Sequence, residues 1–363
     1  MGREFKMNRQ ERLELIRVLS NANGAPGFED DVVTVLRRAV EGLGEVKEDR
    51  MRNLYCFGER REGRPTVQLD AHTDEVGFMV HAIKPNGTLR FITMGGWVNC
   101  NIPSHKVRVR NAKGEYIPGV ITSKPPHFMS AEERGRMPDV AEMAIDIGAS
   151  SAEEAVNEYH IRIGEPVVPD VELEYDEKHE VLIGKAFDCR LGCAAIVDTM
   201  RQVAGEELAV NVVGAFATQE EMGTRGAVVT AQTVAPNLAI VFEGCPADDT
   251  FGESYMMQTK IKHGPYLRHF DARMVTHPRF QRYALDLAAK LGIPVQDGVR
   301  TGGATNGAPI HLSNGYVPTI VIGVPVRYIH THHGIASIAD VENAAKLAAA
   351  ILREMDAETL ERF

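Results

Sequence analysis

Four apolar runs, each bounded by turn residues, alternate with helical stretches along most of this chain. The runs are PTVQLDA (65–71), VNVVGAFAT (210–218), NLAIVFE (237–243) and PTIVIGV (318–324). The stretches between and after them have the apolar spacing of helices and begin near Arg190, Gly223, Pro278 and Asp340. Buried runs that alternate with helices are typical of strands covered on both faces. The sequence therefore predicts an α/β three-layer sandwich with a mainly parallel central sheet.

The two ends of the chain are predicted to be helical. Asn8 and Glu11 form a capping-box pattern that predicts the start of a first helix. A second helix is expected from about Glu29 to Leu43, after a break at Asn23–Gly27. Near the C-terminus, Asp340 is expected to be the N-cap of the last long helix.

The stretch from residue 77 to residue 165 does not alternate. It contains short β-like runs and hairpin signals at Pro85–Gly87 and Asn111–Gly114, and its first clear helix signal is at Ser150–Glu158. Insertions at loop tips leave a host core intact. We therefore predict a discontinuous α/β domain formed by residues 1–76 and 166–363, with a small β-rich domain, residues 77–165, inserted into one of its loops.

Acidic or histidine residues follow the ends of the predicted core strands. They are His72, Asp74, Asp188, Glu220, Glu221, Glu243 and His330. In an open α/β sheet, ligands collect outside the carboxyl ends of the strands. These residues, remote along the chain, are therefore expected to converge.

Carboxylates just beyond a buried strand are costly unless positive charge offsets them. Arg190 and Arg225 are the basic residues near enough in sequence to be candidates. Two divalent ions bring four positive charges, and Asp188, Glu221, Glu243 and a bridging hydroxide would neutralise them. Mixed imidazole and carboxylate ligands suit catalytic zinc or a similar first-row ion. The sequence predicts a pair of divalent ions, zinc, cobalt or manganese, at a hydrolytic site.

The spacing of two pairs suggests a division of roles. Asp74 is placed to accept the second ring N–H of a metal-bound His72, which fixes the tautomer. Glu220 and Glu221 are adjacent, so their side chains diverge on an extended strand end. One can bind metal while the other acts as a general base, the arrangement that hydrolysis by an activated water needs.

Charge and composition exclude several other classes of protein. The formal net charge of −10 argues against a nucleic-acid partner, because phosphate binding needs a basic face. No apolar run approaches the length of a membrane span, and the start lacks the long apolar stretch of a signal peptide. The five cysteines are scattered and odd in number, which favours a reducing compartment over a disulfide framework. We expect a cytoplasmic location.

Seven segments carry a resemblance to a known family. They are LDAHTDEVGFMV, SKPPHFMSAEER, DIGASSAEEA, GKAFDCRLGC, ATQEEMGTRGA, GGATNGAPIHLSNGYVPT and VRYIHTHHG. On these segments, which span nearly the whole chain in family order, the chain resembles the M42 metallo-aminopeptidases. That group is also called glutamyl or tetrahedral aminopeptidases and is sometimes labelled endoglucanase. The resemblance implies removal of N-terminal residues from short peptides. It also implies self-association through the inserted domain into dimers and from dimers into a dodecamer.

The resemblance implies a set of metal ligands. Asp188 would bridge two divalent ions. His72 and Glu243 would complete one site, and Glu221 and His330 the other.

The resemblance also implies the remaining roles. Glu220 would be the general base that, with the metals, turns water into hydroxide, and Asp74 would be the partner of His72. From the residues alone His332 is a rival ligand, because it shares a face with His330 on an extended chain. The family pattern favours His330.

Two positions depart from the family pattern. Glu243 stands where Asp is frequent, and its longer side chain could displace one metal slightly. Asn306 stands where many members carry Asp, in a Gly-Thr-Asp motif that here reads Ala-Thr-Asn. We expect loss of that charge to affect substrate or subunit contacts rather than the metals.

Other functions are compatible with parts of this pattern. An N-acyl amino-acid deacylase or a carboxypeptidase of the same architecture would have nearly the same metal ligands. A glycosidase could use paired carboxylates, but it would leave the two histidines unexplained and usually offers more aromatic residues than the 6% present here. An inactive scaffold would be expected to have lost a ligand or the base.

Overall fold

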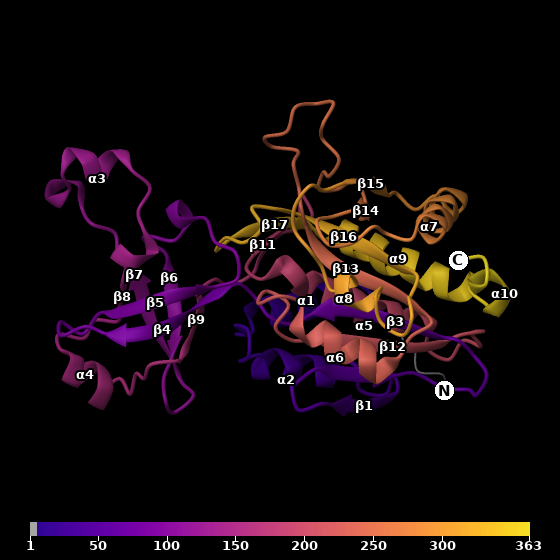
Figure 1. The fold of residues 1–363 in the computed structure, drawn as a ribbon, viewed down its shortest axis with the longest axis horizontal. Coiled ribbons are helices and arrows are strands. Elements are labelled where there is room, and N and C mark those ends of the chain that lie inside the picture. Colours follow the sequence, from indigo (N-terminus) through magenta and orange to yellow (C-terminus); the bar gives the residue numbers. More distant parts are fainter. Residues whose placement is uncertain (1–5) are drawn as a thin grey trace.

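The computed structural model describes residues 6–363, so the first five residues, on which part of the signal-peptide expectation rests, lie outside it. The chain forms an α/β part and a smaller β-barrel beside it (Figure 1). The barrel strands all come from residues 77–169, and the chain on both sides of them contributes to the α/β part.

The α/β part is built on an eleven-stranded mixed sheet. In sheet order the main strands are β1 (Glu45–Glu48), β2 (Leu54–Phe57), β12 (Asn211–Ala217), β3 (Thr66–His72), β13 (Leu238–Pro246), β16 (Thr319–Arg327), β17 (Gly334–Ser337), β11 (Val181–Gly184) and β10 (Glu174–Asp176). Strand β14 (Tyr266–Phe270) pairs with β16 and with β15 (Gln296–Val299). The four predicted strands β12, β3, β13 and β16 are mutually parallel, and the strands flanking them pair antiparallel. The expected parallel arrangement therefore holds for the centre of the sheet.

Helices cover both faces of the sheet. They are α1 (Arg9–Asn21), α2 (Asp30–Ala39), α5 (Phe187–Val203), α6 (Arg225–Val234), α7 (Pro278–Leu291), α8 (Gly307–Ile310), α9 (Ile338–Glu354) and α10 (Ala357–Leu360). Alternate residues of β13 show the layering: Ile240 and Phe242 pack in the core with α5 and α9, whereas Ala239 and Val241 pack with α6 and α8. This confirms the predicted three-layer α/β fold.

The barrel has its own apolar core. Its strands close in the order β4 (Gly77–Ile83), β5 (Leu89–Met94), β8 (Ile145–Asp146), β7 (Tyr116–Ile121), β6 (Lys106–Arg110) and β9 (Pro166–Pro169), all antiparallel. Short helices α3 (Ala131–Gly135) and α4 (Ala152–Asn157) and single turns η1 (Asn99–Asn101), η2 (Pro126–Phe128) and η3 (Val140–Glu142) lie in its connections. Its buried apolar residues form a cluster separate from that of the α/β part.

Most local signals agree with the structure. The Asn8 side chain accepts the Glu11 amide and the Glu11 side chain accepts the Asn8 amide, as in a capping box. Residues 85–87 and 111–114 turn between paired antiparallel strands. No helix within residues 6–363 combines the length and the apolarity that crossing a membrane would require.

The expected N-cap at Asp340 is wrong. Helix α9 begins at Ile338, and Asp340 lies inside its first turn, buried. Its carboxylate accepts the backbone amides of Lys262 and Gly264 at 2.6 and 2.7 Å. Asp340 does accept backbone amides, as an N-cap would. The amides belong to a loop 76 to 78 residues earlier in the chain and not to its own helix.

Candidate metal centre

The acidic and histidine residues singled out in the sequence meet at the carboxyl edge of the parallel strands. His72 is the last residue of β3, and Glu243 lies in neighbouring β13. Asp188 lies at the start of α5, where the chain has left β11. Glu221 follows β12, and His330 lies in the connection from β16 to β17. Five remote segments thus deliver one side chain each to the same place.

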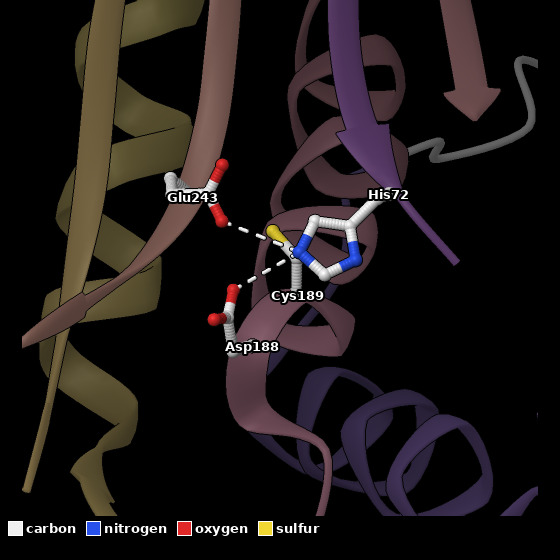
Figure 2. A group of neighbouring side chains, drawn as sticks. All are labelled: His72, Asp188, Cys189 and Glu243. Atoms are coloured by element: carbon white, nitrogen blue, oxygen red, sulfur yellow. Dashed lines mark hydrogen bonds and ion pairs between the residues drawn. The ribbon is translucent and has the colours of Figure 1, made fainter. Parts of the chain in front are cut away.

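Asp188 joins two groups of donor atoms through different oxygens. Its Oδ1 lies 3.0 Å from His72 Nε2, which is also 3.3 Å from Glu243 Oε1 (Figure 2). Its Oδ2 lies 3.3 Å from His330 Nε2, which is 3.3 Å from Glu221 Oε1. A tetrahedron with arms of about 2 Å, typical of zinc, has corners about 3.3 Å apart. Each group therefore has the spacing of ligands around one ion.

Unpaired oxygens supply a second test of the fit. Glu243 Oε2 and Glu221 Oε1 are buried and, among the residues that the structure describes, have no hydrogen-bond donor. A buried carboxylate oxygen without a partner is costly. A cation among these donors would remove that cost, so the residues fit a metal centre.

The buried carboxylates of the site favour positive charge near them, as the pKa values of the neighbouring groups show. Burial favours the neutral imidazole, yet the neighbouring carboxylates of Asp188 and Glu221 raise the pKa of His330 to about 11. Burial also lowers the pKa of His72, but the carboxylates of Asp188, Asp74 and Glu243 outweigh this effect and raise it. Burial and the Asp188 charge raise the pKa of Glu243. In the absence of metal, the raised pKa values therefore favour the protonated, positively charged form of both imidazoles.

Cys189 borders the same group of donors (Figure 2). It is buried, its thiol donates to the Phe242 carbonyl at 3.3 Å, and burial raises its pKa. Cys193 is buried in the same way and donates to the His72 carbonyl at 3.1 Å. Both thiols therefore stay protonated and pack as small core residues.

The paired glutamates lie in a turn, not on the extended strand end that the sequence suggested. Strand β12 ends at Ala217, and the residues before Arg225 form bends and turns. The Asp74 carboxylate accepts the amides of Glu220 at 2.9 Å and Glu221 at 3.0 Å. It also lies 3.4 Å from His72 Nδ1, while the Asp74 carbonyl is slightly nearer that nitrogen, at 3.2 Å. Asp74 therefore fixes the glutamate turn as well as the imidazole.

The two rival histidines do not share a face, because their segment is not extended. Tyr328 and His330 have positive φ values of 59° and 57°. His332 is buried and stacks on His105 of the barrel, with ring centroids 3.8 Å apart. His330 alone of the two reaches the Asp188 group.

A cavity of about 440 Å³ opens beside these donors. Glu220 and His330 line one part of it, and Arg268, Arg273 and Arg300 line another. Sequence reasoning missed these arginines because no motif marks them. The expected basic neighbour Arg190 instead donates to the carbonyl of Leu19 and lies within ion-pair distance of Glu75.

Asn306 has a partner inside the fold. Its side chain is buried and donates to Asp70 Oδ1 at 2.7 Å, beneath the sheet. Gln68 and Thr230 donate to the other oxygen of Asp70. An aspartate at position 306 would set two buried carboxylates against each other, so an amide here matches Asp70.

Comparison with known proteins gives the same assignment over nearly the whole chain. The family model described as M42 glutamyl aminopeptidase matches residues 53–347. The glutamyl aminopeptidase of Lactococcus lactis is 31% identical over 96% of this chain and 98% of its own. A TET aminopeptidase from a marine sediment archaeon of the Thaumarchaeota superposes with a TM-score of 0.93 at 35% identity, covering 97% of this chain and 99% of that one.

A third relative is a TET1 peptidase from Pyrococcus horikoshii that can assemble into a tetrahedron or a large octahedral shell. It superposes with a TM-score of 0.85 at 26% identity, over 95% of this chain and all of that one. A family match over most of the chain, full-length relatives and a cluster of side chains that could hold a metal ion agree. The chain therefore belongs to the M42 glutamyl aminopeptidase family of metal-dependent peptidases.

Proposed function

We propose that this protein is a two-metal aminopeptidase that removes N-terminal residues from short peptides. The observation that carries the proposal is the sharing of Asp188. One of its oxygens faces His72 and Glu243, and the other faces His330 and Glu221. A carboxylate that divides its oxygens between two complete sets of donors is suited to bridging two ions.

His72, Asp188 and Glu243 would hold one ion, and Asp188, Glu221 and His330 the other. Zinc, cobalt and manganese all suit this ligand set. When bound, such ions act as Lewis acids that acidify water and polarise a peptide carbonyl.

Glu220 is the proposed general base. It lies beside the donors, in the wall of the cavity, with a carboxylate oxygen near His72 and Glu221. Burial, with the nearby Glu221, Asp74 and Asp188 charges, raises its pKa to about 8 in the metal-free protein. The Glu220 carboxylate takes a proton from the attacking water, holds it while the carbonyl carbon is attacked, and returns it to the departing amine.

We also propose a preference for an acidic first residue. Of the three cavity arginines, Arg268 pairs with Asp271 and Arg300 with Asp248. Within residues 6–363, no carboxylate lies within ion-pair distance of Arg273, so this arginine brings an unpaired positive charge to the cavity. The Lactococcus lactis relative is named a glutamyl aminopeptidase, which agrees with this charge.

Self-association through the inserted domain, residues 77–165, which forms most of the β-barrel, completes the proposal. Large apolar side chains are exposed on the barrel at Val98, Phe128 and Met137, with 52, 73 and 59% of their surface accessible. Exposed apolar side chains on an inserted domain suit a subunit contact. All five cysteines are free thiols, which suits the reducing cytoplasm in which we propose the protein works.

Replacing the base and replacing the bridge should have different effects. Glu220→Gln is expected to keep both ions and to lower kcat by about a hundredfold or more, the usual scale of general-base catalysis. Asp188→Ala removes a ligand shared by both ions and should release them. Metal content of the purified variants and turnover of an aminoacyl anilide test this.

Asp286→Ala removes an exposed carboxylate on α7 and is the control that should match the parent. Normal turnover in Glu220→Gln would contradict the assignment.

Metal uptake should release protons. Since the pKa of His330 is raised to about 11 and that of His72 is also raised, both imidazoles are protonated at neutral pH without metal. Binding requires the neutral imidazole, so affinity should increase as pH rises from about 6 to about 8. Titration calorimetry of zinc into the metal-free protein, in buffers of different ionisation enthalpy, measures the released protons. A binding enthalpy independent of the buffer would contradict it.

The unpaired charge of Arg273 predicts that its removal changes substrate specificity. Arg273→Met should lower kcat/KM for glutamyl peptides by about threefold or more, the scale of a partly exposed ion pair, and leave leucyl peptides nearly unchanged. Arg282→Met removes the same charge from the exposed face of α7 and should change neither. An acetylated N-terminus should abolish cleavage of all of these peptides, whereas a deacylase would accept it.

Self-association predicts a mass well above that of the 39.9 kDa chain. Light scattering at micromolar concentration should report a dimer or a larger assembly. Phe128→Asp should reduce the mass while the melting temperature stays near that of the parent, because Phe128 is exposed. A monomeric parent protein would contradict the proposal.

A further inference from the structure

The turn that carries the glutamate pair is held in an unusual way. Each of its four successive backbone N–H groups, at residues 218–221, donates to a side-chain oxygen. The pairs are Thr218 to Asn53 Oδ1 at 2.8 Å, Gln219 to Glu29 Oε1 at 3.1 Å, Glu220 to Asp74 Oδ1 at 2.9 Å and Glu221 to Asp74 Oδ2 at 3.0 Å.

This turn needs outside support because the sheet no longer supplies it. Strand β12 ends at Ala217, and the carbonyls of residues 218–220 accept amides from the start of α6 and the residues before it. Gln219 has a φ of 54°, a left-handed conformation that costs a non-glycine residue free energy. Such a conformation persists only where neighbouring contacts determine it.

Glu29 is the acceptor whose placement is hardest to explain otherwise. It directly precedes α2, at the N-cap, yet its side chain makes no hydrogen bond to that helix. Instead it is buried, and its Oε1 accepts the amides of Gly27 at 2.9 Å and Gln219 at 3.1 Å. Burying a carboxylate is costly, so a carboxylate turned away from its own helix toward a remote turn indicates a role at that turn.

We propose that Glu29 is a positioning residue for Glu220. By holding the Gln219 amide it fixes the backbone one residue before the base, while Asp74 fixes the amide of the base itself. The inference rests on the proposed role of Glu220. It adds a residue that touches neither metal nor substrate but sets where the base points.

The role of Glu29 is to accept hydrogen bonds, not to supply charge. Its Oε2 is buried and has no hydrogen-bond partner among residues 6–363. Burial and the Asp74 charge raise the pKa of Glu29 to about 7, so its surroundings disfavour the charged form. Glutamine offers the same Oε1 acceptor at the same reach, whereas aspartate keeps the charge but is one methylene shorter.

Three variants separate reach from charge. Glu29→Ala and Glu29→Asp should lower kcat about tenfold or more, because displacing a catalytic group by about 1 Å can cost a hundredfold in rate. Their metal content should equal that of the parent and KM should change less than threefold. Glu29→Gln should restore kcat to within about threefold of the parent. Thr34→Ala, on the exposed face of α2, is the control that should leave kcat unchanged.

Hydrogen exchange gives a readout that does not depend on turnover. In the metal-free protein, a peptide spanning residues 216–224 should exchange faster in Glu29→Ala and Glu29→Asp than in the parent or in Glu29→Gln. A peptide from α9 should exchange at the parent rate in all of them. If Glu29→Ala does not fold, the Asp and Gln variants still decide between reach and charge.

Distinct outcomes would overturn each level of the proposal. Parent-like kcat and exchange in Glu29→Asp and Glu29→Ala would show that Glu29 does not position the base. Equal loss in Glu29→Gln and Glu29→Ala would show that charge is what matters. If Glu220→Gln itself turns over normally, the proposed function fails; if it is inactive while the Glu29 variants are normal, the positioning role alone fails.

Discussion

The main physical constraint on this structure is electrostatic, because several carboxylates are buried close together at the carboxyl edge of a parallel sheet. Asp188 lies at the centre, between two imidazoles and two glutamates. These carboxylates raise the pKa of both imidazoles, so the site favours positive charge. A metal ion among these donors would supply that positive charge. The parallel strands matter because they bring their carboxyl ends to a single edge.

The sequence was sufficient to predict the fold and the residues that converge, because both depend on local patterns. The four apolar runs became β3, β12, β13 and β16, and the acidic and histidine residues after them lie together. The edge strands were not predicted, since short half-exposed strands such as β1 carry little apolar signal. The position of Asp340 was misjudged because a loop amide competes with the helix cap for the same carboxylate.

Residues that act across long sequence separations could not be found from one sequence. Asn53 and Glu29 hold the glutamate turn from 165 and 190 residues away, and neither lies in a pattern that marks such a role. The arginines of the cavity come from segments with no motif. The choice between His330 and His332 depended on positive φ values in the connection from β16 to β17, which a periodicity argument assumes to be extended.

The β-barrel also bears on the metal centre directly, through the two glycines that follow β5. A Cβ on Gly95 would lie 3.1 Å from Glu221 Oε2, and one on Gly96 would lie 3.1 Å from His330 Nδ1. Glycine at both positions lets the barrel backbone approach two side chains of the same donor group. His332, two residues after His330, stacks on His105 of the barrel. The barrel backbone therefore borders one half of the donor set, at Glu221 and His330, from outside the α/β part.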